Sequence, residues 1–356
     1  MTIPINRTFL KFSLATNHLW KNHGEHPMNK VLILTGPAGD AQGWGDLEVT
    51  RQLCDTLNSG DKAAEIVFIE NKQTFLDAIE TKSYDIIWSA LYHISTKADI
   101  VGLSEDDGLW IADILDSKGI PYIGPDALTM KRLIQKNLTH EILKQNQVAV
   151  PYFYTVDIGE TIPDSLYPVI VKPSCESRSI GISDDSVVNT PDNLERAINY
   201  IHSEFEQPAL IEEYLPGAEY TVLMFGNGEN QEFLSGVVKV DASHYGKYPI
   251  LRSDLRGVGL TKIHRPTTRE EESIELTRQA VAALHCLDHV RVDMRVGADG
   301  NLKIIEVNGI PGLKPDKSWS PQIYSLYHAS PGGVMEEYRQ LVHIIVDSGL
   351  SRYGLI

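Results

Sequence analysis

The chain lacks an excess of basic residues, and this narrows the classes of partner that it can have. It carries 32 lysines and arginines against 48 aspartates and glutamates, and its formal net charge is −16. A nucleic-acid-binding protein needs a basic surface to displace counterions from phosphates. Attachment to a membrane surface through lysine and arginine needs the same kind of surface. We therefore expect neither a nucleic acid nor a membrane as a partner.

The chain also has few cysteines and no long apolar segment. Its 3 cysteines lie far apart, and neither they nor its 12 histidines recur at the short spacings of a zinc site. Unpaired cysteines favour a reducing, cytoplasmic setting. No apolar run approaches the ~18 residues that a membrane helix needs. Residues 1–27 lack the basic start and unbroken apolar core of a signal peptide, and we expect them to be an extension outside the fold.

What the chain does have is a regular alternation of segments from residue 28 to residue 127. Amphipathic stretches there predict helices, and short apolar runs between them are typical of buried parallel strands. The predicted strands are 30–35, 65–69, 84–91 and 120–123, and the predicted helices are 47–59, 72–82 and 105–117. This βαβ succession predicts an N-terminal domain with a doubly wound parallel sheet. The glycine-rich segment 36–45 matches neither the dinucleotide fingerprint nor the P-loop.

After residue 128 the pattern changes to one helix followed by strands and hairpins. The helix is predicted over 128–146, a hairpin turn at Asn227-Gly228, and a second helix from about 268 to 285. The strands are predicted at 167–172, 209–214, 219–225 and 233–240.

The most informative segment is a predicted hairpin over residues 290–308. Its first strand alternates strictly, so Arg291 and Asp293 point to the same face. With a two-residue turn at the Asp-Gly pair between the strands, Asp293 stands opposite Glu306, and Arg291 stands opposite Asn308. Facing carboxylates repel unless cations compensate them. Either arginines do so on a solvated face, or a magnesium ion does, with the amide of Asn308 and nucleotide phosphates as further ligands.

Two further regions suit a nucleotide. A buried strand ends in Lys172, and a lysine in such a run costs desolvation unless it meets an anion. The loop 174–183 is rich in serine and suits phosphates, although an ordinary polar loop has the same composition. The strand 209–214 could pair its backbone with an adenine edge. Glu219 could then accept hydrogen bonds from ribose hydroxyls, or be an ordinary surface acid.

Together and in this order, these motifs resemble the ATP-grasp ligases, and within them the D-alanine–D-alanine ligase group. The resemblance covers nearly all of residues 29–349. It implies an ATP-grasp fold of the mixed α/β class, with subdomains at 128–215 and 216–356. It also implies ATP and two magnesium ions as cofactors, small-molecule substrates and a homodimer.

The resemblance implies a role for each matching residue. Magnesium would be held by Asp293, Glu306 and Asn308, while Arg291 would stabilise a tetrahedral intermediate and Lys172 would neutralise the transferring phosphoryl group. Asp46 or Glu48 would orient the amine of the first substrate. A third phosphate lysine would be Lys239 or Lys247. The residues that would hold ATP are Lys136, Lys172, Ser177, Ser179, Glu212, Glu213, Leu215 and Glu219.

The implied reaction has two steps. ATP phosphorylates an oxygen of the first substrate, and an amine then attacks the activated carbon as phosphate leaves. Closure of the loop 174–183 as a flap would exclude water between the steps.

Positions that would face the substrates depart from the family pattern. The family's His-Gly loop becomes a longer insert that begins at His93 and runs towards Ser104-Glu-Asp-Asp-Gly108, and Arg178 occurs in the flap where the family has a small residue. The loop with Lys317 and Ser318 is one residue longer than usual, and Ser318 is the best candidate to bind an amino-acid carboxylate. These departures favour a specialised ligase, such as the one that adds serine or threonine to mycosporine-glycine. The alternatives are a D-alanine–D-alanine ligase of cell-wall synthesis and a nucleotide-binding module without ligase activity.

Overall fold

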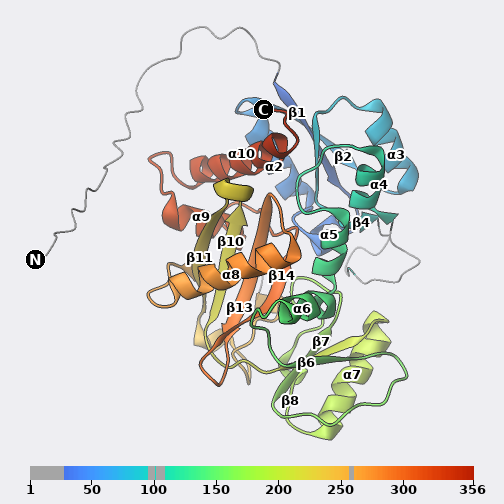
Figure 1. Ribbon diagram of the computed structural model, residues 1–356, viewed down its shortest axis with the longest axis vertical. Coiled ribbons are helices and arrows are strands. Elements are labelled where there is room, and N and C mark those ends of the chain that lie inside the picture. The colour runs from blue at the N-terminus through green and yellow to red at the C-terminus, as the bar shows by residue number, and fades with distance from the viewer. Residues whose placement is uncertain (1–27, 95–100, 102–108, 256–259) are drawn as a thin grey trace, which may run out of the picture.

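A computed structural model of the chain describes residues 28–94, 101, 109–255 and 260–356. The expected N-terminal extension and the expected turn at 104–108 lie outside these residues. The described strands form four sheets, of three, five, two and four strands, and helices cover them (Figure 1). The predicted mixed α/β class is confirmed.

The N-terminal part contains the predicted parallel sheet, with the strand order β2-β1-β3. The expected fourth strand at 120–123 contributes only one parallel bridge, between Ile87 and Tyr122. Val31 to Thr35 of β1 are all buried, because helices cover both faces of a parallel sheet. The elements are β1 (Asn29–Thr35), α1 (Gly39–Gln42), α2 (Leu47–Asn58), β2 (Lys62–Phe68), α3 (Lys72–Thr81), β3 (Ile86–Ser89), β4 (His93–Ile94), β5 (Leu109–Trp110) and α4 (Ile111–Lys118).

The helix expected over 128–146 is two helices, and this prediction was therefore wrong. Helix α5 (Ala127–Ile134) ends and α6 (Lys136–Gln145) begins at Gln135, whose φ of −91° and ψ of 95° are not helical. The backbone N–H of Lys136 donates to the carbonyl oxygen of Ser174 over 3.0 Å. Periodicity could not reveal the break, because both halves keep an apolar face. The break makes Lys136 the first residue of a helix.

Two antiparallel sheets make up most of the remaining chain. The four-stranded sheet has the order β6-β9-β7-β8, and the five-stranded sheet has the order β12-β11-β10-β13-β14. Their strands are β6 (Phe153–Val156), β7 (Val169–Pro173), β8 (Val187–Val188), β9 (Ala209–Glu213), β10 (Glu219–Phe225), β11 (Glu232–Val240), β12 (Thr261–His264), β13 (His289–Val296) and β14 (Leu302–Asn308).

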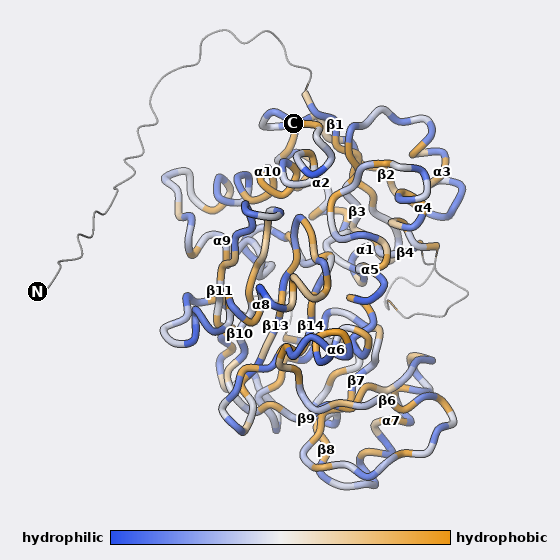
Figure 2. The backbone as a smooth tube through the Cα atoms, viewed as in Figure 1, coloured by the Kyte–Doolittle hydropathy of each residue, from blue (hydrophilic) through white to orange (hydrophobic). Residues whose placement is uncertain are grey.

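Amphipathic helices cover these sheets. Helix α7 packs on β7 and β9, and α8 packs on β10 and β11; the strands are mostly hydrophobic, whereas the helices alternate between hydrophobic and hydrophilic residues (Figure 2). The last helix, α10, returns to the N-terminal part, where Leu341 and Ile345 share a buried cluster with Leu53 and Leu57 of α2. The helices are α7 (Pro191–Phe205), α8 (Glu270–Leu284), α9 (Trp319–Tyr327) and α10 (Val334–Arg352), and short 3-10 turns lie at Asp184–Ser186, Gly228–Asn230, Ala242–His244 and Ser253–Leu255.

The β13–β14 hairpin has the predicted pairing at its far end and a different turn. Asp293 pairs with Glu306 and Arg291 with Asn308, as predicted. The turn is longer than two residues, since the N–H of Gly297 donates to the carbonyl of Asn301 over 2.8 Å. A bulge at Ile305 restores the register, because Met294 pairs with Ile304. Bulges of this kind often lie beside active sites, where they redirect the strand.

Candidate active site

Two cavities meet at the end of this hairpin. We call the first the loop cavity, because the segment 40–49 and the loop 310–319 form most of its wall. We call the second the sheet cavity, because β7, β9 and β14 line it. Both are lined by Lys136 and Glu306, whose Nζ and Oε1 atoms lie 3.3 Å apart. The two cavities therefore adjoin at this ion pair.

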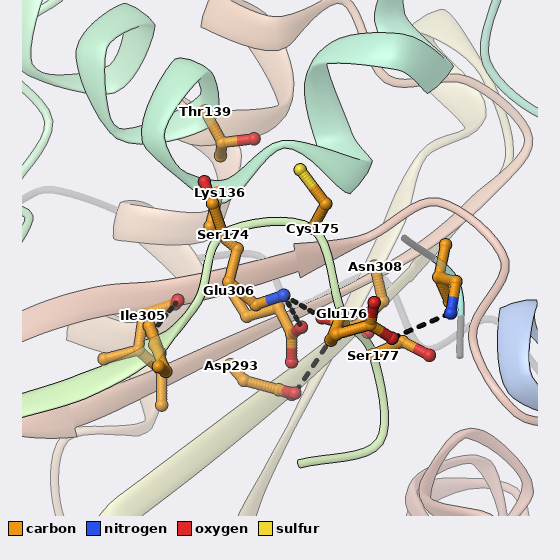
Figure 3. A network of polar contacts seen from close by, with 12 residues as sticks. Lys136, Thr139, Ser174, Cys175, Glu176, Ser177, Asp293, Ile305, Glu306 and Asn308 are labelled. Carbon is orange, nitrogen blue, oxygen red and sulfur yellow. Dashed lines mark hydrogen bonds and ion pairs between the residues drawn. The ribbon is translucent and has the colours of Figure 1, made fainter. Parts of the chain in front are cut away.

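Lys136 is held at this junction by groups from two segments, the loop 174–183 and β14. Its backbone is fixed by Ser174, and its Nζ donates to the carbonyl oxygen of Glu176 as well as pairing with Glu306. Figure 3 shows the lysine side chain pointing from the start of α6 towards both of these residues. The carboxylate of Glu176 accepts hydrogen bonds from the N–H of Val101 (2.7 Å) and from Gln207 Nε2 (2.8 Å). The ammonium group is therefore preorganised where the cavities join.

Lys172 projects from β7 into the sheet cavity and is fixed by a buried acid. Its Nζ lies 2.7 Å from Glu212 Oε1, and His140 Nε2 lies 2.8 Å from the same oxygen. Burial alone would raise the pKa of the Glu212 carboxyl, but Lys172 and His140 outweigh it and hold this pKa at about 2. The side chain of Glu212 is thus engaged in positioning Lys172.

The other residues expected to hold ATP also line the sheet cavity, except Ser177, which lines the loop cavity instead. Ser179, Glu213, Leu215 and Glu219 all contribute to its wall. The carboxylate of Glu213 is turned towards Lys303, whose Nζ lies 2.8 Å from both of its oxygens. Apolar walls beside these polar groups suit a flat base, and the walls are formed by Ile170, Ile180, Ile182, Ile250, Leu251 and Leu215.

The residues expected to hold magnesium are brought together on one face of the hairpin. Asp293 is almost fully buried and accepts hydrogen bonds from Thr221 Oγ1 (2.7 Å) and Asn308 Nδ2 (3.2 Å). Glu306 faces it across the ladder. Within the described residues there is no group of three or more His, Cys, Asp or Glu side chains that could by itself hold a metal ion. The donor set nevertheless fits magnesium, which favours two carboxylates completed by an amide oxygen and phosphates.

Arg291 connects this face to the loop cavity. Its Nε and Nη2 atoms donate to the two carboxylate oxygens of Asp293 over 2.8 and 2.7 Å. Its guanidinium carbon lies 4.8 Å from the ring centroid of Trp319, a distance typical of a cation–π contact. Burial would lower the pKa of Arg291, but Asp293 raises it above its usual value. The guanidinium is therefore a fixed positive charge on the cavity wall.

The flap residues Ser177 and Arg178 close the loop cavity from one side. Ser177 Oγ donates to the carbonyl oxygen of Ala41, and Arg178 Nη1 donates to the carbonyl of Asp40 (3.0 Å) and to its carboxylate. The flap thus contacts α1 of the N-terminal part.

Among the residues expected to face substrates, the structure brings some to the loop cavity and not others. Asp46, Lys317 and Ser318 line it. The hydroxyl of Ser318 accepts a hydrogen bond from the N–H of Lys314 over 2.9 Å, so its own hydrogen remains available. Glu48 lies outside the lining, with its Oε2 atom 3.9 Å from Lys314 Nζ.

His93 and the two candidate third lysines also lie outside both linings. The ring of His93 packs edge-on against Trp110, with 5.4 Å between centroids. Lys239 lies on β11 opposite Lys262. Lys247 places its Nζ over the ring of Tyr248, 5.2 Å from the centroid.

Four residues that line the loop cavity or support the two lysines were not among the residues predicted from the sequence. Tyr92 and Trp319 line the loop cavity, and His140 and Glu176 support the two lysines. A signal existed for His140, because it follows Lys136 by four residues and such residues share a helix face. No local pattern distinguishes the other three from ordinary buried residues.

A protein-family model described as "D-ala D-ala ligase C-terminus" matches residues 155–347, which is more than half of the chain. The chain belongs to this ligase family. The expectation of an ATP-dependent amino-acid ligase with an ATP-grasp fold is thereby confirmed.

Individual relatives of this ligase agree with the family match. This chain is 29% identical over 232 residues to a putative D-alanine--D-lactate ligase of Streptomyces coelicolor, and the match covers 62% of this chain and 65% of the relative. It is 27% identical over 320 residues to a D-alanine--D-alanine ligase of Thermotoga maritima, covering 86% and 96%. The crystal structure of a D-alanine--D-alanine ligase from Bacillus anthracis complexed with ATP has a TM-score of 0.65 at 22% identity, covering 91% and 98%. This structural likeness shows the fold alone.

Proposed function

We propose that this ligase phosphorylates an oxygen of a small acceptor and joins the activated carbon to the amine of an amino acid. ADP and phosphate are released. The observation that supports this reaction most directly is the junction of the two cavities at Lys136 and Glu306. A nucleotide in the sheet cavity would place its terminal phosphate there, within reach of an acceptor in the loop cavity.

The charges at the junction suit phosphoryl transfer. Lys136 and Lys172 would bind phosphate oxygens, and their anchors, Glu176 and Glu212, hold them in place before the nucleotide binds. Magnesium bound by the carboxylate face of the hairpin would neutralise charge on the transferring group. Fixed positive charges of this kind lower the barrier because they need no rearrangement during the reaction.

The second step, in which the amine attacks, requires a hydrogen-bond donor on the loop-cavity side of the junction. Arg291 faces the loop cavity and stays charged, so it can stabilise the negative oxygen that develops as the amine attacks. Asp46 would bind the ammonium group of a substrate, and Ser318 with Lys317 would bind the carboxylate of the incoming amino acid. The flap contacts of Ser177 and Arg178 would exclude water, which otherwise hydrolyses the activated acceptor.

For the substrates, we favour addition of serine or threonine to a mycosporine-glycine core. Two tryptophans, Trp44 and Trp319, line the loop cavity beside Arg178, Lys314 and Lys317. This combination suits an acceptor that carries both a ring and a carboxylate. A second candidate is D-alanine–D-alanine ligation, which the names of the relatives favour.

A panel of amines and acceptors, scored by ADP release, separates these candidates. We expect release only when an amino acid and a ring-bearing acceptor are present together with Mg-ATP. Turnover with D-alanine alone would make the second candidate correct. ATP binding without turnover under any combination would favour a non-catalytic nucleotide-binding module. The variant Arg291→Ala serves as the matched negative control.

We further propose a homodimer and two magnesium ions per site, which follow from the family resemblance, and a cytoplasmic location, which the unpaired cysteines favour. Within the described residues, no helix is long and apolar enough to cross a membrane. The subdomain boundaries at residues 127 and 215 stay predictions. Sedimentation and metal titration in the presence of ATP would test the first two proposals.

A further inference from the structure

Tyr92 connects the N-terminal part to the loop that follows β14. Its backbone N–H donates to Gln42 Oε1 over 2.7 Å, and its carbonyl accepts from the N–H of Ile111 over 3.0 Å. The residue is only 5% exposed. Because the backbone is held on both sides and the ring is buried, the position of the phenol is fixed before any substrate binds.

The hydroxyl oxygen of Tyr92 is fully used as an acceptor. It accepts hydrogen bonds from the backbone N–H groups of Gly309 (3.0 Å) and Ile310 (2.9 Å). A hydroxyl oxygen has two acceptor positions and one hydrogen to donate. The hydrogen must therefore point in a third direction, and within the described part of the chain no acceptor lies within hydrogen-bond distance of it.

This third direction leads into the loop cavity. Tyr92 is part of its wall, together with Asn308 and Glu306, next to the junction with the sheet cavity. The absence of a side chain at position 309 permits this approach, since a Cβ atom there would lie 3.2 Å from the Tyr92 hydroxyl oxygen. The phenol thus has a donor hydrogen at the place where phosphoryl transfer would occur.

The phenol also keeps its hydrogen at neutral pH. Burial raises the pKa of Tyr92 above its ordinary value of 10, outweighing the two backbone N–H groups that lower it. A buried donor without a partner is costly, whereas the same donor is strong when it meets an anionic oxygen.

We propose that the Tyr92 hydroxyl donates a hydrogen bond to the acceptor oxygen that receives the phosphoryl group. When the amine attacks the carbon that carries this oxygen, the carbon–oxygen bond breaks and the oxygen leaves as part of the phosphate. The hydrogen bond would strengthen as negative charge develops on this oxygen. This inference rests on the proposed ligase reaction. It assigns the contact to Tyr92 and not to its neighbour His93, whose ring packs on Trp110.

The test compares Tyr92→Phe with Tyr338→Phe in the full-length protein. Tyr338 is a suitable control because it is buried in α10 and its hydroxyl has no partner among the described residues. With the acceptor and amino acid identified by the ADP-release panel, Tyr92→Phe should lower kcat/KM for the acceptor roughly 10- to 100-fold, which is the worth of a hydrogen bond to a charged group. The affinity for Mg-ATP and the KM for the amino acid should stay unchanged, and Tyr338→Phe should behave as the wild type.

Three results would contradict the proposal in different ways. An unchanged kcat/KM for the acceptor would overturn it while leaving the ligase reaction intact. A parallel loss of Mg-ATP affinity would show that Tyr92 only supports the loop after β14. If the wild type shows no acceptor-dependent ADP release, the proposed reaction and this inference both fail.

A second substitution covers the case in which Tyr92→Phe does not fold. Site-specific 3-fluorotyrosine at position 92 keeps the oxygen that accepts from Gly309 and Ile310 and makes the hydroxyl a stronger donor. A changed kcat/KM for the acceptor would support the proposal, and an identical value would overturn it.

Discussion

The buried group formed by Glu212, Lys172 and His140 predicts a large and pH-dependent effect of one substitution. Glu212→Gln replaces a carboxylate that accepts from Lys172 Nζ at 2.7 Å and from His140 Nε2 at 2.8 Å. All three side chains are buried. The substitution keeps the shape of the side chain and leaves the ammonium group of Lys172 without its counter-charge.

The size of the effect follows from the pKa of Glu212. A lowering from 4.5 to about 2 corresponds to about 3 kcal/mol at roughly 1.4 kcal/mol for each tenfold change in acidity. Removing one partner of a buried ion pair typically costs about 3–5 kcal/mol. The two values agree, and we expect Glu212→Gln to lower the free energy of unfolding by about 3 kcal/mol at neutral pH.

The effect should disappear in acid. A carboxyl whose pKa is lowered in the folded state stabilises the protein above the pKa of the unfolded chain, and this contribution is lost as pH falls towards the folded value. The difference between wild type and Glu212→Gln should therefore shrink as pH falls from 4.5 towards about 2. Mg-ATP affinity should also fall, because Lys172 is no longer held in place.

Urea unfolding followed by circular dichroism, at neutral pH and at about pH 3, measures both quantities. Glu204→Gln is the matched control, since Glu204 is an exposed acid on α7 of the same subdomain. A loss below about 1 kcal/mol, the ordinary worth of an exposed ion pair, would refute the reasoning. So would a loss of the same size at both pH values.

Three further predictions concern the reaction. Arg291→Ala should lower amide formation at least about 100-fold, the typical cost of losing one oxyanion donor, while ATP binding is retained. Equal losses of amide formation and of ATP binding would contradict the role assigned to Arg291. Glu306→Gln should weaken magnesium-dependent ATP binding at least roughly tenfold, the lower limit for altered metal shells, whereas binding without metal should not change in a calorimetric titration. Arg178→Gln should raise ADP release without amide product up to about fivefold, because a half-exposed pair contributes at most about 1 kcal/mol. Asp40→Asn should reproduce this leak, and the double variant should add nothing to it.

The sequence predicted the local elements because each depends on a short repeat. Alternation with period two placed Arg291 and Asp293 on one face of a strand, and the structure confirms their pairing with Asn308 and Glu306. The apolar runs of the first domain predicted the parallel sheet in the same way. The family resemblance then supplied ATP and the ligase activity, which the family match confirms.

Parts of the site could not be predicted, because they depend on contacts between distant residues. The helix break that directs Lys136 into the junction accompanies a hydrogen bond to Ser174, and the pattern of apolar residues continues through it. The bulge at Ile305 compensates for a turn that is longer than predicted. The predicted pairing of the two strands was therefore correct, although the sequence indicated neither the longer turn nor the bulge.

The sequence by itself therefore predicted many of the side chains that line the two cavities, since residue type and local spacing are written in it. The tertiary structure alone decided how they are held. Glu212 meets Lys172 and His140 across a sheet and a helix, and the hydroxyl of Tyr92 meets the N–H groups of Gly309 and Ile310 more than 200 positions later in the chain. Such contacts depend on how whole elements pack, and packing is a property of the folded chain that no short repeat records.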